Sequence, residues 1–232
     1  MNMQTIDTGK LKFIDLSQRI YPVEGEIAPD DYVRLVLEEA LVWPLKTYGS
    51  YVDDTVYQVV KMKTHVKTHT ESPFHLDRKG PPLSEYAPET FFGRAVYFYF
   101  DVGADAIITR EMIEKVDHGR LKKGDIAIIH TAWTPEQGGE KPEILKDAGQ
   151  YFLDKGIKYF GQSECLSIFR NGADSTHDLL LKNKIPLLEM LVNLDKLTQD
   201  VFFLIAIPGL MKVQGIDSST TQAVAIEGLE VI

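Results

Sequence analysis

The chain has 232 residues, of which 44% are hydrophobic and 25% are charged, a balance typical of a globular protein with a substantial core. Its formal net charge of -9 argues against nucleic acid and anionic membranes as partners, because an acidic protein repels phosphate groups. A single cysteine, Cys165, excludes an internal disulfide framework and suits a reducing compartment.

The opening segment and the most apolar stretch of the chain indicate its cellular location. The opening segment "MNMQTIDTGKLKFIDLS" lacks the apolar run of a signal peptide. The most apolar segment, "DVFFLIAIPGLM" (200–211), is too short to span a bilayer and contains a Pro-Gly break. We therefore expect a cytoplasmic protein, and the length favours a single domain over residues 1–232.

Strand-like segments occur along the whole chain. They are rich in Val, Ile, Tyr and Phe and are bounded by Gly, Pro or Asp, which is the usual pattern of strands. In chain order, the predicted strands are residues 12–17, 55–70, 93–102, 124–133, 157–162, 201–207 and 222–232.

Helical patterns are fewer and lie in the second half. Residues 141–156 predict a helix, with Pro142 in the first turn and Gly156 at the end. Residues 175–184 open with two candidate N-caps, and residues 187–197 suit either a short helix or a strand leading into one. Strands that outnumber helices predict an α/β or α+β fold.

One segment carries most of the chemistry. Residues 64–75, "THVKTHTESPFH", contain three of the six histidines. Because β-branched residues favour strands, alternation along the strand would place His65, Lys67, His69 and Glu71 on one face. Two imidazoles and a carboxylate are suitable ligands for zinc, manganese or iron.

An ordinary polar strand is the alternative interpretation of this segment. Surface strands often carry histidine, and Lys67 between two histidines is typical of a solvent-facing position. The helical H-E-x-x-H signature of zincins is absent, since no glutamate lies between His65 and His69. The twelve residues alone leave the metal site and the surface strand both open.

The segment "HVKTHTESPFH" resembles the H-x-G-T-H-x-D-x-P-x-H signature of the cyclase-like metal-dependent hydrolases, the kynurenine formamidase and isatin hydrolase type. Four other stretches are similar to segments of the same family, so the resemblance covers essentially the full chain. These stretches are "FIDLSQRIYP", "GDIAIIHTAW", "STHDLLLKNKIPLLEMLVNLDKL" and "FFLIAIPGLMKVQGIDSSTTQAVAI".

The resemblance implies a site and a fold. It implies catalytic roles for His75, which would transfer protons, and for Glu189, which could hold the attacking water. The fold implied is the swivelling β/α/β type, a mixed sheet with helices packed against it. The implied cofactor is a divalent metal, Zn²⁺ or Mn²⁺, bound as one or two ions. The implied metal ligands are His65, His69, Glu71, His177 and Glu189.

Several positions depart from the family pattern and indicate a divergent member. Glu71 replaces the usual aspartate, Glu164 lies where a Gly-x-Asp turn is usual, and Gln222 replaces an arginine. Lys67 replaces the motif glycine. Lys67 could displace a second metal, pair with Glu71, bind an anionic substrate, or point to solvent.

The function implied is hydrolysis of a carbon–nitrogen bond in a small amide, formamide or cyclic imide-like substrate, as in an arylformamidase. Two alternatives remain: a lactonase or dehydrating cyclase on the same metal, and a catalytically silent metal-binding or ligand-binding protein. The family commonly forms homodimers or larger homo-oligomers, in which neighbouring chains contribute to the pocket. The partner expected is therefore a small-molecule substrate together with further copies of this chain.

Residues outside the motif receive structural interpretations. Cys165 is expected to be a buried hydrophobe, because no nucleophile signature surrounds it. His130 is expected to be a satisfied histidine at a strand end, with a place at the border of the pocket as the alternative, and His118 is expected in a loop. The aromatic side chains that could line an apolar pocket or the core are Trp43, Tyr48, Tyr51 and Trp133.

Overall fold

The computed structural model describes residues 8–22, 35–39, 58–169 and 174–229. Within them, nine strands form one mixed sheet in the order β1-β13-β11-β5-β7-β9-β10-β4-β12. The strands of this sheet are β1 (Lys12–Asp15), β4 (His69–Glu71), β5 (Phe92–Phe100), β7 (Ile126–Thr131), β9 (Tyr159–Ser163), β10 (Leu187–Leu191), β11 (Val201–Ile205), β12 (Ser218–Thr220) and β13 (Val224–Glu227).

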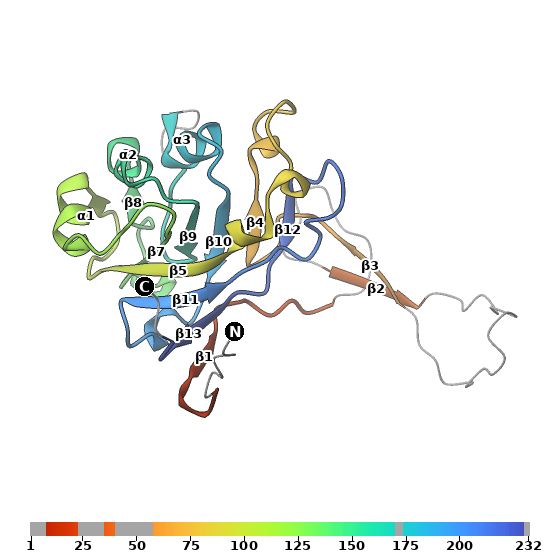
Figure 1. Ribbon diagram of the computed structural model, residues 1–232, viewed down its shortest axis with the longest axis horizontal. Coiled ribbons are helices and arrows are strands. Elements are labelled where there is room, and N and C mark those ends of the chain that lie inside the picture. The colour runs from red at the N-terminus through yellow and green to blue at the C-terminus, as the bar shows by residue number, and fades with distance from the viewer. Residues whose placement is uncertain (1–7, 23–34, 40–57, 170–173, 230–232) are drawn as a thin grey trace, which may run out of the picture.

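Helices α1 (Arg110–Asp117), α2 (Lys146–Lys155) and α3 (Thr176–Lys182) lie side by side along one side of the sheet (Figure 1). Two smaller sheets accompany it. Strand β2 (Leu35–Glu39) pairs with β3 (Gln58–Met62) and projects away from the main body, whereas β6 (Ile107–Ile108) pairs with β8 (Glu143–Ile144).

The centre of the sheet is parallel. Strands β5, β7, β9 and β10 run in the same direction, and the connections between them contain α1, α2 and α3 in turn. Parallel neighbours need such crossovers, since a tight turn can join only antiparallel strands. Antiparallel β4 and β11 flank the parallel strands. These features confirm the predicted mixed sheet with helices packed against it.

Two cores lie on opposite faces of the sheet, and β5 contributes to both. Val96, Phe98 and Phe100 pack toward the helices, whereas Ala95 and Tyr97 belong to the core on the other face. The two-residue period of a strand produces this alternation. A strand buried on both faces therefore appears in the sequence as a nearly continuous apolar run.

The predicted continuous strand over residues 55–70 is wrong, although residues 55–57 lie outside the described residues. Strand β3 ends at Met62, the backbone bends through residues 63–68, and β4 begins at His69. Lys67 has φ 53°, a left-handed conformation that a pleated strand does not contain. The argument that alternation alone gathers the motif side chains is therefore wrong as well.

The helix predicted over residues 141–156 starts later than expected. Glu143 and Ile144 pair with β6 as strand β8, so Pro142 precedes a strand and not a helix. The end is as predicted, because Gly156 adopts a left-handed C-cap. Of the two alternatives for residues 187–197, the structure has the strand, β10, followed by a 3₁₀ turn at residues 194–196.

Helix α3 confirms the helix predicted at residues 175–184. The Ser175 hydroxyl caps it by accepting a hydrogen bond from the Asp178 amide at 3.1 Å. Helix α1 was not predicted, although the Thr109 hydroxyl caps it by accepting from Met112. None of the helices in the described part of the chain is long and apolar enough to cross a bilayer.

Candidate metal centre

Strands β4 and β10 bring three of the predicted ligands together. In their antiparallel pairing, Glu189 lies directly opposite His69 and Leu187 lies opposite Glu71. Side chains that are opposite on such a pair share one face of the sheet. Thr70, between the two ligands, points to the other face, where its hydroxyl contacts the Tyr159 hydroxyl.

Glu189 lies in an irregular stretch of β10. The register of β10 against β9 shifts between Leu188 and Leu191, and Met190 has φ 63°. A bulky side chain in the left-handed region is strained, and such residues cluster at functional sites. The Met190 carbonyl is held by the Thr68 hydroxyl at 2.9 Å, which stabilises the bulge beside the motif.

His65 and His75 join the cluster from outside β4. His65 lies in the bend before the strand, and its Nε2 is 3.0 Å from Glu71 Oε2. His75 ends a 3₁₀ helix, Pro73–His75, and its ring centroid lies 4.4 Å from that of His65. His65 therefore lies in a bend and not on the strand face where sequence reasoning placed it, whereas His75 follows Pro73 outside the strand, as the sequence predicts.

Helix α3 supplies His177, whose Nε2 lies 2.6 Å from Glu71 Oε1. His177 Nδ1 lies 3.0 Å from Asp178 Oδ1, an arrangement that directs Nε2 toward the cluster. Glycine at position 149 of α2 allows α3 to approach closely, because a Cβ there would come within 2.7 Å of the Thr176 side chain. The later His/Glu pair and the early motif therefore converge on one point.

Glu71 is the buried carboxylate at the middle of the cluster. Burial acts to raise its pKa, but hydrogen bonds from His177 and His65, together with their charges, lower the pKa below its ordinary value. Each of its two oxygens accepts from a different imidazole. Glu71 is therefore ionised and lies between the two groups of histidines.

Glu189 and His69, which lie opposite each other on β10 and β4, each have a buried polar atom without a hydrogen-bond partner among the described residues. These atoms are Glu189 Oε1 and His69 Nε2. His69 Nδ1 donates to the Lys67 carbonyl at 2.7 Å, so the lone pair of the neutral ring is on Nε2. Burial lowers the pKa of His69 and favours this neutral form, the one that binds metals.

The environment of Glu189 differs from that of Glu71. Burial raises the pKa of Glu189 well above its ordinary value, and the nearby charge of Glu71 raises it further. Two close carboxylates, an unpaired imidazole nitrogen and an unpaired carboxylate oxygen are a donor set that a divalent cation would satisfy. The residues present thus fit the metal that the family resemblance implies.

Two overlapping groups of donors have the spacing of metal ligands. One group is His65, Glu71 and His75, and the other is Glu71, His177 and Glu189. In each group the donor atoms lie within 4.8 Å of one another, and Glu71 belongs to both. His75 belongs to the first group only, and His69, opposite Glu189, belongs to neither. Together these residues would supply donors for one or two divalent cations.

Two supporting acids were missed by sequence reasoning. Asp217 Oδ2 lies 3.5 Å from His75 Nδ1, and its hydrogen bond raises the pKa of His75, while the pKa of Asp217 is lowered to about 2. The Ser72 amide donates to the Asp217 carbonyl at 2.9 Å, which places Asp217 beside the motif. No local pattern reveals Asp217, whereas Asp178 could have been suspected from its position next to His177.

The predicted ligands surround a cavity of about 330 Å³. Phe169 lies at this cavity, 48% exposed, with its ring centroid 4.7 Å from that of His177. The residues lining the cavity are His65, His69, Glu71, His75, Phe169, Ser175, His177, Asp178 and Glu189.

Lys67 lines a separate recess, which corrects its expected position on the ligand face. It shares that recess with Glu164 and Asn193, and it is not among the residues that line the metal cavity. Its left-handed backbone turns the side chain away while the carbonyl orients His69. Gln222, at the usual arginine position, donates to Asp15 at 2.8 Å.

The remaining predicted positions lie elsewhere. Cys165 is half-buried and, with Trp133 and His130, lines another cavity. His118 is the left-handed C-cap of α1. The proposed pocket aromatics Trp43, Tyr48 and Tyr51 lie outside the described residues.

Comparison with known proteins identifies the family and the fold of the chain. The family described as "Putative cyclase" matches residues 14–168. No curated protein sequence matches the chain. Isatin hydrolase A from Labrenzia aggregata is 21% identical with a TM-score of 0.73, and 94% of each chain is covered.

Two further solved structures are similar. Isatin hydrolase A from Ralstonia solanacearum is 19% identical, with a TM-score of 0.72 over 97% of this chain and 99% of that one. A protein from Bacillus stearothermophilus, described as a "predicted metal-dependent hydrolase", is 20% identical, with a TM-score of 0.68 over 93% and 98%. The chain thus has the fold of the isatin hydrolases, and it belongs to the cyclase family.

Proposed function

We propose that this chain is a metal-dependent hydrolase that cleaves a carbon–nitrogen bond in a small amide, formamide or cyclic imide-like substrate. The observation that carries the proposal is the pair of unpaired buried atoms, His69 Nε2 and Glu189 Oε1, beside the ionised carboxylate of Glu71. Buried polar atoms normally have partners, so two unpaired atoms on residues that line one cavity indicate a ligand.

The cation expected is Zn²⁺ or Mn²⁺, held by His65, His69, Glu71, His177 and Glu189 as one or two ions. When bound, such a cation polarises a carbonyl oxygen and lowers the pKa of a coordinated water toward neutrality. The Lys67 carbonyl and Asp178 fix the ring orientations of His69 and His177, so the nitrogens are in place before binding.

His75 is the proposed proton carrier. Its side chain is 37% exposed, more than those of the neighbouring histidines, and it borders the cavity. Asp217 raises its pKa, which suits a group that must accept a proton from water and return it to a leaving nitrogen. Glu189, with a raised pKa, could hold the attacking water by a hydrogen bond.

The substrate class is supported by size and by the cavity wall. A volume of about 330 Å³ suits a small molecule, and the exposed ring of Phe169 offers an aromatic face beside His177. A structural neighbour is an isatin hydrolase bound to the product analogue thioisatinate. An aryl amide or a cyclic amide fused to an aromatic ring is therefore the form of substrate we propose.

The decisive experiment combines elemental analysis with turnover. The purified protein is expected to contain zinc or manganese and to hydrolyse members of a panel of formanilides and cyclic imides more readily than lactones. His69→Ala should lose the metal, whereas His75→Ala should retain metal and lose turnover. His118→Asn is the control, because this distant histidine has a left-handed backbone that asparagine tolerates.

The outcomes separate the alternatives. Preferential turnover of lactones would favour a lactonase, and bound metal without turnover of any substrate would favour a silent binding protein. Normal metal content and normal turnover in both histidine variants would contradict the roles proposed for them. We also propose a homodimer or larger homo-oligomer, which sedimentation at several concentrations tests.

A further inference from the structure

A second cavity, of about 650 Å³, lies apart from the metal centre. It shares no lining residue with the metal cavity. The metal centre faces α3 through His177, whereas Tyr97, in the wall of the second cavity, belongs to the core on the opposite face of the sheet. The two cavities are therefore separate sites.

The second cavity lies at the carboxyl ends of the four parallel strands. Tyr99 comes from the end of β5 and His130 from the end of β7. The segments that follow β7, β9 and β10 contribute Trp133, Cys165 and Asn193. In open α/β sheets, ligands bind in crevices at the carboxyl ends of the strands, because loops from neighbouring strands converge there.

Aromatic rings form one wall of this cavity. Tyr97 and Tyr99 are stacked with ring centroids 6.4 Å apart, and the ring of His130 lies 5.8 Å from that of Tyr99. Tyr99 is 45% exposed, so its ring is available to a ligand. Trp133 is nearly buried, and its Nε1 donates to the Gly138 carbonyl at 3.1 Å.

His130 lies at the end of β7 as expected, but the prediction that it is satisfied is wrong, because one of its ring nitrogens has no hydrogen-bond partner among the described residues. This atom, Nδ1, is buried. Burial lowers the pKa of His130, so the ring is neutral and carries one donor and one acceptor nitrogen. A ring surrounded by aromatic faces with an unpaired nitrogen could take a hydrogen bond from a bound molecule.

The charged residues that line the cavity are all acidic, although Lys196 outside the lining donates to Asn193 at 2.7 Å. The carboxylates lining it are Glu164, Asp195 and Asp200, and neither lysine nor arginine lines it among the described residues. Glu164 accepts from Gln18, and Asp200 pairs with Arg120 outside the cavity. Asp195 is exposed and lies close enough to Tyr97 and His130 to interact with them electrostatically. A positively charged group on a ligand would complement the Asp195 carboxylate.

We propose that this cavity binds a small aromatic cation of the arylalkylammonium class. The aryl ring lies against Tyr99 and His130, and the ammonium group lies toward Asp195 and the faces of the tyrosine rings. Cations are attracted to the faces of aromatic rings, and a cavity of this volume is within the range that small ligands occupy. This binding function uses no residue of the proposed hydrolase site.

The test uses two probes of similar shape and opposite charge. The full-length protein is titrated with phenethylammonium and with 3-phenylpropionate by calorimetry and by ligand-observed NMR. Phenethylammonium should bind saturably at one site per chain and the propionate should not. Tyr99→Ala should weaken binding about fivefold and Asp195→Asn about threefold, as expected for a partly exposed cation–π contact and ion pair.

Matched controls remove an aromatic ring and a carboxylate elsewhere. Phe13→Ala deletes an exposed ring on β1, and Glu85→Gln removes a carboxylate that lines a different cavity. Both variants should bind phenethylammonium as the parent does. Removal of metal by a chelator should leave this binding unchanged while abolishing any hydrolase turnover, so the two proposals fail separately.

Several results would overturn the proposal. These are equal binding of the two probes, full affinity in Tyr99→Ala, and loss of binding after chelation. Failure of the parent protein to bind phenethylammonium would overturn it on its own. If Tyr99→Ala also dissociated an oligomer, the cavity would be an interface between copies of this chain.

Discussion

Two buried carboxyl groups in this molecule, those of Asp117 and Glu189, differ in the number of hydrogen bonds that their oxygens accept. Asp117, at the contact of α1 and α2, accepts from the Leu121 amide at 2.8 Å, the Tyr151 hydroxyl at 2.6 Å and Lys155 Nζ at 3.1 Å. Glu189, in the metal centre, has a buried oxygen with no partner among the described residues. Both carboxyl groups are nearly inaccessible to solvent.

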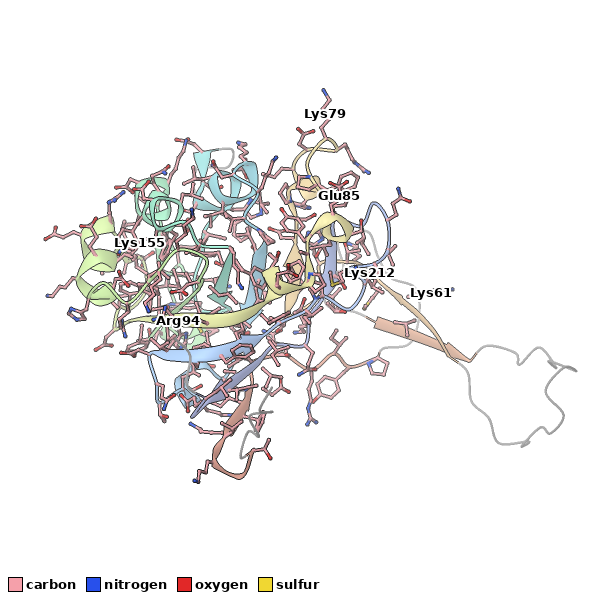
Figure 2. The ribbon with its side chains drawn as sticks, viewed as in Figure 1. Lys61, Lys79, Glu85, Arg94, Lys155 and Lys212 are labelled. Atoms are coloured by element: carbon pink, nitrogen blue, oxygen red, sulfur yellow. The ribbon has the colours of Figure 1, made fainter. Side chains whose placement is uncertain are left out.

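The pKa values follow this difference. Burial acts to raise the pKa of Asp117, but its three hydrogen bonds and the charge of Lys155 lower it, whereas burial and Glu71 raise the pKa of Glu189. Lys155 is the last residue of α2, and Figure 2 shows it well away from Glu85, which ends the 3₁₀ helix Leu83–Glu85. A satisfied acid indicates a structural role, and an unsatisfied buried acid indicates a group kept for a ligand.

The largest expected effect comes from removing the shared charge of the metal centre. Glu71→Gln should reduce metal affinity by more than about 100-fold, because the loss of a charged donor common to both groups should exceed the cost of losing a supporting residue. Metal content after dialysis measures the effect. Near-normal metal content in this variant would contradict the comparison, since Glu71 would then be structural like Asp117.

A smaller loss is expected from the acid that orients His177. Asp178→Asn should lower metal affinity or turnover by about 10- to 100-fold, because the carboxylate that accepts from Nδ1 also makes Nε2 more basic. Lys182→Ala is the matched control, since Lys182 contacts the other oxygen of Asp178 at 3.0 Å from outside the site. An equal effect of both substitutions would point to helix stability and not to metal binding.

Substitution of Asp117, the acid with a structural role, should affect stability and not metal binding. Asp117→Ala should lower the free energy of unfolding by about 2 kcal/mol, because buried donors lose their acceptor, and leave metal content unchanged. The folded state lowers the pKa of Asp117, so its ionised form contributes stability above the ordinary pKa of 3.8. This contribution is lost as pH falls through the folded-state pKa.

Denaturant titrations at several pH values check both parts of that prediction. The difference in stability between the parent and Asp117→Ala should be largest near neutral pH and should shrink in acid. A difference that grows as pH falls would show that the sign of the Asp117 pKa shift is wrong.

The smallest effect is expected at Lys67. Lys67→Gly should change the free energy of unfolding by no more than about 1 kcal/mol, because relief of the left-handed backbone is offset by greater freedom of the unfolded chain. The carbonyl that orients His69 remains, so metal content should not change. A large gain in metal binding would show that the Lys67 side chain opposes the cation after all.

The sequence by itself determined several strands of the main sheet, the mixed class of the fold and the residue types at the site. The run 93–102, rich in Tyr and Phe, became β5, and the Ile-rich run 124–133 became β7. Ser175 capped α3 as expected. These features depend on short stretches of chain, where propensity and capping act between near neighbours. The motif and the resemblance likewise nominated six side chains that the structure brings to one cavity.

Only the tertiary structure decided how those side chains meet. The bend before β4 and the bulge at Met190 are joined by the hydrogen bond from Thr68 to the Met190 carbonyl, and β4 pairs with β10 and β12. No single window of sequence contains these contacts. Asp217 reaches His75 because β12 pairs with β4. Local propensity specifies an element, but the register between distant elements sets the atoms that face each other, because pairing and packing form only when the whole sheet assembles.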